Sequence, residues 1–465
     1  MDLLYFQLQK EKNIPLYEQL YEGIKNAIIK QQLTEGTKLP SKRQLADFFE
    51  ISQTTVEQAY AQLLAEGYIL SKPRVGYFVE SIDELPFIEQ VKPKLAEPRE
   101  KVPFIIDFSL SKIDEDSFPF DIWRKYARDL FDTPAKHLLQ TGERQGEYSL
   151  RTEIAHYLLQ SRGIECSPEQ IVIGSGTEQL LPMILSLFDY DAKLALENPG
   201  YSPIPRSQLH QLAIPIPVDK DGLIIEALEK SEADLVYVTP SHQFPTGAVL
   251  SATRRTQLLK WATQKQSRYI IEDDYDSEFR YIGKPIPALL GLDQNNKVIY
   301  LSTFTKSLMP SLRVAYFVLP PALLTVYQQN FTYYSSTVPR FDQHILASFM
   351  KDGHFSKHLN RMRKIYRKKH DKLIETLKNH YAQIHVSGDF AGMHIVISFE
   401  HSETEQRLLT IAKQAHINIL PLSNYLLTAQ KTKQPTFLIG FGNIPLQDIE
   451  KAIHTLMAVW QIKRN

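Results

Sequence analysis

The chain has 465 residues, which is too long for one ordinary hydrophobic core, so we expect two or three domains. Its 43% hydrophobic and 23% charged residues are typical of a globular protein, and no apolar run approaches the roughly 18 residues that a membrane span needs. The 53 basic and 53 acidic residues cancel, so any binding of nucleic acid must come from a local patch.

Residues 1–80 carry three helical patterns followed by a hairpin pattern. The first, PLYEQLYEGIKNAIIKQQL, places apolar residues on one stripe and has Pro15 in its first turn. The second begins after Ser41 and the third after Ser52, and serine favours the N-cap position of a helix. This spacing predicts a helix-turn-helix, and the alternating segment GYILSKPRVGYFVE behind it predicts a wing.

The segment LPSKRQLADFFEISQTTVEQAYAQLLAEGYI resembles the winged helix-turn-helix of GntR-type bacterial regulators, and the resemblance covers residues 12–80. It implies binding to a double-stranded DNA operator, with phosphates held by the second helix and bases read by the third. Residues 1–80 hold nine basic and ten acidic side chains, so the attraction to DNA must be local, and a winged helix used only for dimerisation or protein contact is the alternative. The predicted DNA-binding residues are Ser41, Lys42, Arg43, Gln53, Thr54, Thr55, Lys72 and Arg74.

Residues 81–104 are rich in proline and charge and have no amphipathic period, so we expect a linker there. From residue 105 onward, strand-like and helix-like segments alternate, which predicts a mostly parallel, doubly wound α/β sheet with helices on both faces. Ligands of such sheets bind at the carboxyl ends of the strands. The strand patterns are QIVIGSG, KLALENPG, DLVYVTPSH, RYIIEDDYD, KVIYLSTFTK and VAYFVLP.

The ends of four of these strands carry residues that together predict a site for pyridoxal 5′-phosphate (PLP). Lys306 follows a buried strand and is surrounded by hydroxyls, as a Schiff-base lysine beside a phosphate would be. The turn GSGT opens a helix whose free N–H groups favour a phosphate, and Arg313 offers a bidentate donor for the same group. In EDDYDSEF an aspartate can keep a pyridinium nitrogen protonated and Tyr275 can bond the ring oxygen, while Tyr201 can stack on the ring.

Residues from about 105 to 460 resemble a fold-type I aminotransferase, and a GntR-type segment followed by such a domain is the order of the MocR/GabR family of bacterial regulators. The motifs TPSHQFPTG, YIIEDDYDSEF, PALLGLD and TFTKSLMPSLR carry this resemblance. It implies a smaller C-terminal α/β subdomain at roughly 345–465 and a head-to-tail homodimer. The residues alone leave open whether Asp273 or Asp274 faces the ring nitrogen, and the resemblance implies Asp273. The predicted cofactor-binding residues are Lys306, Asp273, Tyr275, Tyr201, Ser175, Gly176, Thr177, Thr303, Thr305 and Arg313.

A transaminase must also bind the carboxylate of its substrate, and fold-type I enzymes do this with a C-terminal arginine. No arginine lies between Arg407 and Arg464, and Phe244 takes the place of the asparagine in the NPTG turn of aminotransferases. We therefore predict a regulator without efficient transamination that senses PLP itself, similar to the PdxR type of the family, which switches vitamin B6 synthesis genes. Two alternatives stay open: a regulator whose effector is an amino acid such as GABA, and a working aminotransferase fused to a DNA-binding domain.

A single cysteine, Cys166, excludes an intrachain disulfide and is typical of a reducing compartment. The first fifteen residues lack the basic and apolar segments of a signal peptide. We therefore expect a cytoplasmic protein with no membrane partner, and we predict no metal site.

Overall fold

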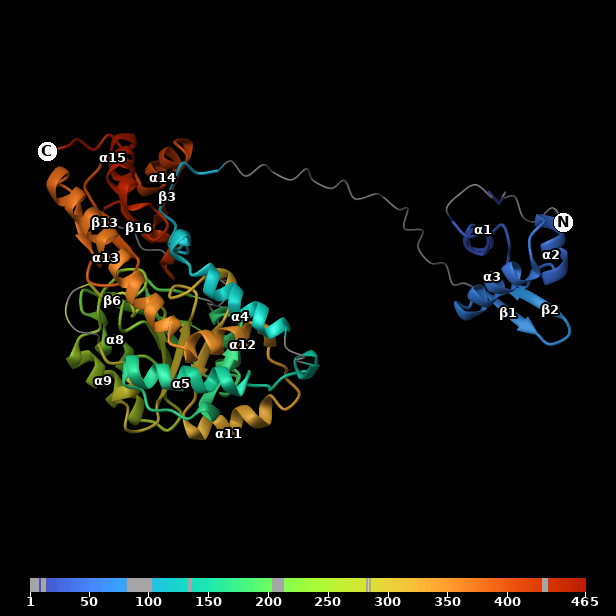
Figure 1. The fold of residues 1–465 in the computed structure, drawn as a ribbon, viewed down its shortest axis with the longest axis horizontal. Coiled ribbons are helices and arrows are strands. Elements are labelled where there is room, and N and C mark those ends of the chain that lie inside the picture. The colour runs from blue at the N-terminus through green and yellow to red at the C-terminus, as the bar shows by residue number, and fades with distance from the viewer. Residues whose placement is uncertain are drawn as a thin grey trace. The chain divides into compact units, whose positions relative to one another are not determined.

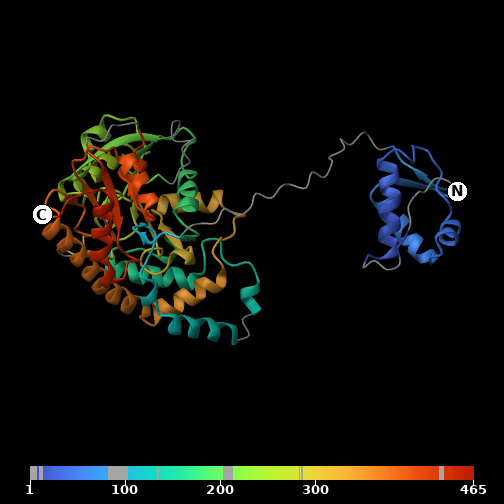
Figure 2. The same cartoon turned by 90° about the horizontal axis from the view of Figure 1, so that it is seen from above.

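The chain forms two compact units, Met1–Glu100 and Lys101–Asn465, which are drawn in Figures 1 and 2. Most of the expected linker, 81–104, lies outside the described residues. Within the described part of the chain, no helix is both long enough and apolar enough to cross a membrane. This computed structural model describes residues 8–9, 14–81, 103–132, 136–202, 213–281, 283, 286–428 and 434–465.

The first unit is a winged helix-turn-helix around one hydrophobic core. Leu20 and Ile24 of the first helix pack with Val56 and Leu63 of the third, and none of the four has exposed surface. Two short strands pair antiparallel and form the wing, as the sequence predicts. The elements are α1 (Leu16–Ile29), α2 (Lys42–Phe49), α3 (Gln53–Ala65), β1 (Ile69–Lys72) and β2 (Gly76–Val79).

An eight-stranded sheet organises the second unit, in the order β4-β11-β10-β9-β8-β5-β6-β7. The central strands β10, β9, β8, β5 and β6 are parallel, and β11 runs antiparallel between β10 and β4. The predicted mostly parallel α/β sheet is confirmed, and each of the six predicted strand segments forms a strand. The strands are β4 (Ile171–Gly174), β5 (Leu194–Asn198), β6 (Ala213–Asp219), β7 (Gly222–Leu223), β8 (Leu235–Val238), β9 (Tyr269–Asp274), β10 (Val298–Thr303) and β11 (Ala315–Val318).

Helices cover both faces of this sheet. In β10, Ile299 and Leu301 pack in a cluster with α6 and α11, whereas Val298 packs on the opposite face with α8 and α9. Because successive side chains of a strand point to opposite faces, a strand that is buried on both faces needs the continuous apolar run seen here. The helices are α4 (Phe120–Asp132), α5 (Tyr148–Arg162), α6 (Thr177–Leu185), α8 (Ile225–Glu229), α9 (Ala252–Thr263), α10 (Leu289–Leu292), α11 (Pro321–Asn330) and α12 (Arg340–Lys351).

A smaller subdomain is built on an antiparallel sheet of order β12-β13-β16-β15. The expected boundary at residue 345 falls inside α12, a helix that packs on α4 and α5 of the large sheet's layer. The segment that opens the second unit also joins the smaller subdomain, because β3 (Ile106–Asp107) pairs with β14 (Ile417–Asn418). The remaining elements are α13 (His354–His380), β12 (His385–Ser387), β13 (His394–Ser398), α14 (Glu405–Gln414), β15 (Leu420–Pro421), β16 (Thr436–Gly440) and α15 (Ile449–Val459).

Candidate functional site

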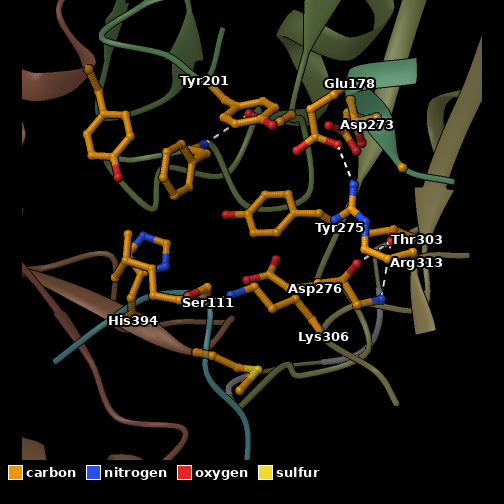
Figure 3. A pocket seen from close by; sticks show the side chains of 18 residues that line it. Ser111, Glu178, Tyr201, Asp273, Tyr275, Asp276, Thr303, Lys306, Arg313 and His394 are labelled. Carbon is orange, nitrogen blue, oxygen red and sulfur yellow. Dashed lines mark hydrogen bonds and ion pairs between the residues drawn. The ribbon is translucent and has the colours of Figure 1, made fainter. Parts of the chain in front are cut away.

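A cavity of about 260 Å³ opens where the parallel strands of the large sheet end (Figure 3). The turns that follow β4, β8, β9 and β10 all reach it, because the carboxyl ends of these strands lie at one edge of the sheet. The smaller subdomain contributes part of the wall. The lining residues are Leu110, Ser111, Gly176, Thr177, Glu178, Tyr201, Thr239, Phe244, Asp273, Tyr275, Asp276, Thr303, Thr305, Lys306, Arg313, Met393, His394 and Tyr425.

Lys306 is the one lysine among the described residues that line this cavity. The chain leaves β10 at Thr303 and turns over Phe304, whose ring is buried in the core, and this turn carries Lys306 into the cavity. The amine donates a hydrogen bond to the carbonyl of Leu110. Burial lowers the pKa of the Lys306 amine to about 8, while the carboxylate of Asp276 acts in the opposite direction. The neutral amine, the form that attacks a carbonyl carbon, is therefore more abundant near neutral pH than it is for an exposed lysine.

The two adjacent aspartates at the end of β9 point in different directions. Asp273 lines the cavity, where Tyr237 donates a hydrogen bond to one of its oxygens and the other, Oδ1, is buried without a partner among the described residues. Asp274 instead pairs with Arg162 at 2.7 Å and accepts a hydrogen bond from Tyr300 at 2.7 Å. Burial raises the pKa of Asp273 to about 7, so a cation in the cavity would favour its ionised form.

The start of α6 forms an anion cradle together with the turn after β10. Gly176 caps α6 at a φ of 140°, and a Cβ at this position would lie 2.4 Å from Nη2 of Arg313. Only glycine leaves this space beside the guanidinium. Arg313 donates a hydrogen bond to Glu178 at 2.9 Å, and the hydroxyl oxygens of Thr303 and Thr305 lie 2.7 Å apart at the cavity wall.

Nine of the ten residues predicted for cofactor binding line the cavity, and Ser175 does not. The Ser175 hydroxyl and backbone N–H both donate to Oε1 of Gln179, at 3.0 Å and 2.7 Å. The side chain is thereby turned toward the first turn of α6. Thr177 lies two residues later and is the hydroxyl-bearing residue of this turn that lines the cavity.

Aromatic rings form another wall of the cavity. Phe244 meets Tyr201 edge to face at 6.0 Å and Tyr425 at 4.8 Å. Aminotransferases have an asparagine at the position of Phe244. The Phe244 ring carries no hydrogen-bonding group, so it forms part of the cavity wall but offers no polar contact. Tyr201 is half-buried, and its burial raises the pKa of the hydroxyl well above the ordinary range.

Nine lining residues were not among the predicted site residues, and four of these nine are titratable: Glu178, Asp276, His394 and Tyr425. The first two lie in segments that the sequence singled out, so their acidic character was the available signal. His394 begins β13, and Tyr425 follows β15, and no local pattern connects either of them to Lys306. Their position depends on the packing of the smaller subdomain.

In the first unit, the N-terminus of α3 presents polar side chains outward. Gln53 and Thr54 are exposed. The Ser52 hydroxyl accepts a hydrogen bond from the Thr55 backbone N–H at 3.1 Å and lies 2.8 Å from the Thr55 hydroxyl, so the Thr55 hydroxyl takes part in the helix cap. Ser41 caps α2 by a capping box.

The predicted cations of this unit differ in their surroundings. Arg43 is exposed on α2, whereas the Lys42 amine forms an ion pair with Glu57 of α3. In the wing, Lys72 lies over the ring of Phe78 and Arg74 adopts a φ of 61° at the turn between β1 and β2. Both wing cations are exposed and can reach a phosphate backbone.

Comparison with known proteins matches each of the two units to a family and finds relatives that contain both units. Residues 16–79 match the bacterial regulatory proteins of the gntR family, and residues 105–456 match aminotransferase class I and II. The uncharacterized HTH-type transcriptional regulator YdeL of Bacillus subtilis is 41% identical over 99% of this chain and 100% of its own length. The probable rhizopine catabolism regulatory protein MocR of Rhizobium meliloti is 31% identical, over 97% and 95%. The chain belongs to the MocR family of transcriptional regulators.

Other comparisons agree with this MocR-family assignment. The pyridoxine biosynthesis transcriptional regulator PdxR of Corynebacterium glutamicum is 31% identical over 88% of each chain. A kynurenine aminotransferase of Pyrococcus horikoshii, solved in complex with PMP, superposes with a TM-score of 0.68 at 24% identity, over 78% of this chain and 92% of that chain. The second unit therefore has the fold-type I aminotransferase fold, and the GntR-type unit makes the chain a DNA-binding regulator.

The cofactor of this MocR-family domain is pyridoxal 5′-phosphate, and the cavity fits it at three points. The unpartnered Oδ1 of Asp273 can pair with a pyridinium N–H. The space that Gly176 leaves beside Arg313 suits a phosphate at a helix N-terminus. The partly neutral amine of Lys306 suits an aldehyde carbon. The residues present thus match the ring nitrogen, the phosphate and the aldehyde.

Proposed function

We propose that this protein senses PLP and controls vitamin B6 biosynthesis genes in response. The observation that carries the proposal is the distribution of charge in the cavity. Arg313 is the one arginine among the described lining residues, and it lies in the anion cradle. On the side of the smaller subdomain the wall consists of Met393, His394 and Tyr425.

These three side chains give an amino-acid carboxylate no cation to pair with. Burial, together with the neighbouring His242, holds the pKa of His394 well below its usual range, so that this imidazole is neutral at physiological pH. A carboxylate taken out of water without a paired cation loses several kcal/mol of solvation. PLP avoids this cost, because its phosphate has its own cradle. We therefore favour PLP as the signal over an amino acid such as GABA, and regulation over efficient transamination.

Each of the nine lining residues predicted for cofactor binding has a role in this proposal. PLP supplies an electrophilic aldehyde carbon when it is bound. The neutral amine of Lys306 would hold the cofactor covalently, Asp273 would keep the ring nitrogen protonated, and Tyr275 would bond the ring oxygen. Tyr201 would cover the ring. The residues that would hold the phosphate are Gly176, Thr177, Thr303, Thr305 and Arg313.

Regulation needs a link between this cavity and DNA. We propose a head-to-tail homodimer that presents two winged helices to one operator, since two-fold symmetric readers bind paired half-sites. PLP then shifts the equilibrium between two dimer states by its differential affinity for them. The likeness to PdxR, whose name states a role in pyridoxine biosynthesis, supports the choice of target genes.

A DNA-binding titration tests this function. The full-length protein is titrated onto the region upstream of vitamin B6 synthesis genes at fixed salt, with and without PLP. We expect PLP to change the operator affinity by roughly 5- to 150-fold, the range of ordinary allosteric coupling, and GABA, glutamate or alanine to add little. An amino acid that shifts both the cofactor spectrum and the operator affinity at sub-millimolar concentration would overturn PLP as the signal.

The exposed end of α3 leads to a prediction about base readout. Thr54→Ala should relax specificity at one or two operator positions, by about 1–3 kcal/mol each, because a lost base contact affects only that base. Arg43→Ala should instead weaken all sequences alike and reduce the salt slope by about one, as a lost phosphate contact does. Gln62→Ala is the matched control, since Gln62 lies near the other end of α3 and bonds Glu66. A Thr54→Ala variant with unchanged preference at every position would assign the readout to the wing.

A further inference from the structure

A buried acid–base pair lies directly behind Tyr275. Asp276 is 2% exposed and His242 is 1% exposed, and Nδ1 of His242 lies 2.9 Å from Oδ2 of Asp276. The same nitrogen lies 3.0 Å from the Tyr275 hydroxyl. The His242 ring therefore connects the Asp276 carboxylate with the tyrosine of the cofactor site, while its Nε2 is buried without a partner among the described residues.

The backbone of the smaller subdomain closes over this pair. Gly392 has a φ of 77°, and a Cβ there would lie 2.1 Å from Cε1 of His242 and 2.5 Å from Oδ2 of Asp276. Gly392 is fixed on both sides: its N–H donates to Phe279 at 2.7 Å and its carbonyl accepts from the Tyr281 hydroxyl at 2.7 Å. A carboxylate enclosed in this way is shielded from water, so its charge needs a partner inside the protein.

Among the described residues, the amine of Lys306 is a cation that interacts electrostatically with Asp276. Both residues line the cavity, and Figure 3 shows the amine end of Lys306 directed toward the Asp276 carboxylate. Asp276 favours the protonated form of that amine and so opposes the effect of burial on its pKa. Among the described residues, the titratable groups that face Asp276 are Lys306, His242, His394, Tyr275, Tyr281 and Asp273.

We propose that Asp276, oriented by His242, is the counter-ion of the nitrogen that Lys306 contributes to the PLP-loaded site. This inference rests on the proposed covalent binding of PLP. It adds the identity of the group that keeps the Lys306 nitrogen protonated once PLP is bound. A negative charge close to a buried cation favours the charged form by one or more pH units. His242 acts as a positioning residue: it holds the carboxylate and ties it to the Tyr275 hydroxyl, on the side of the cavity where Phe244 offers no polar group.

The test is a spectroscopic pH titration of the full-length protein loaded with PLP. The visible absorbance of the bound cofactor depends on whether the Lys306 nitrogen is protonated, so its midpoint reports the pKa of that nitrogen. Asp276→Asn should lower the midpoint by at least about one pH unit, because the carboxylate charge is removed at nearly constant volume. Asp276→Glu should restore most of the wild-type midpoint, and His242→Asn should lower it by less than Asp276→Asn.

Glu278→Gln is the matched control, because Glu278 is a carboxylate two residues further on that bonds Tyr157 and does not line the cavity. Its midpoint should stay near that of the wild type. The proposal is also supported if the visible band of the protonated form persists to the highest pH in the wild type but disappears with rising pH in Asp276→Asn. Equal midpoints in Asp276→Asn and the wild type would overturn the proposal that Asp276 is the counter-ion. If Asp276→Asn does not fold, a His242→Asn variant with the wild-type midpoint would overturn it instead. A wild type without any reducible bond to PLP would instead contradict the proposed function itself.

Discussion

Replacement of Lys306 by alanine should abolish covalent binding of PLP. Among the described residues that line the cavity, Lys306 is the only lysine, so no other amine there can react with the aldehyde. Borohydride reduction followed by mass spectrometry should show the mass of reduced cofactor on the wild type and none on Lys306→Ala. The visible absorbance of the loaded protein should be lost as well.

The pH dependence of loading follows from the same amine. Its pKa is lowered to about 8, and only the neutral form attacks a carbonyl carbon, so the loading rate of the wild type should rise as the pH increases through about 8 and then level off. Lys306→Arg keeps a positive charge without a neutral amine and should also fail to react. Lys297→Ala is the matched control. Lys297 lies just before β10 and its amine donates to the carbonyl of Gln266, so its replacement should leave loading intact. A reducible adduct on Lys306→Ala would move the assignment to another lysine.

The large sheet could be predicted from the sequence because its strands carry a local signal. The first four residues of VIYLST are apolar and point alternately to the two faces of the sheet. Helices cover both faces, so all four are buried, as the apolar run predicts. The same holds for the winged helix, whose two serine caps mark where α2 and α3 begin. The place of β3 could not be predicted, because its pairing with β14 joins residues more than 300 positions apart.

The cofactor pocket shows the same division between local and distant signals. The turns after β4, β9 and β10 each carry several of the predicted residues, and the sheet brings these turns to one edge. Local geometry decided two details that composition could not: Ser175 bonds Gln179, and Asp274 turns away to Arg162. His394 reaches the cavity only because the smaller subdomain packs over it. Such contacts are long-range and leave no periodic pattern in the sequence.

The pair of Arg162 and Asp274 supports both the fold and the direction of Asp273. Arg162, at the end of α5, is 4% exposed at its side chain and Asp274 is 2% exposed, and their closest atoms are 2.7 Å apart. Arg162 also donates to the carbonyl of Ile286 at 2.9 Å and to the Ser241 hydroxyl at 3.0 Å. The guanidinium therefore ties α5 to β9 and to the turn after β8, and it holds Asp274 on the side of the sheet away from the cofactor.

Arg162→Met should lower the free energy of unfolding of the second unit by about 3–5 kcal/mol, because it leaves the Asp274 carboxylate buried without its cation. Denaturant unfolding followed by fluorescence would measure the loss. Arg124→Met is the matched control: Arg124 pairs with Asp121 at 3.1 Å on the surface, with side chains 75% and 95% exposed, and its loss should cost less than about 1 kcal/mol. Arg162→Met combined with Asp274→Leu should recover part of the stability, since the second change removes the stranded charge. Equal stability of the two single methionine variants would show that the Asp274 charge is balanced without Arg162, and the direction of Asp273 would then need another cause.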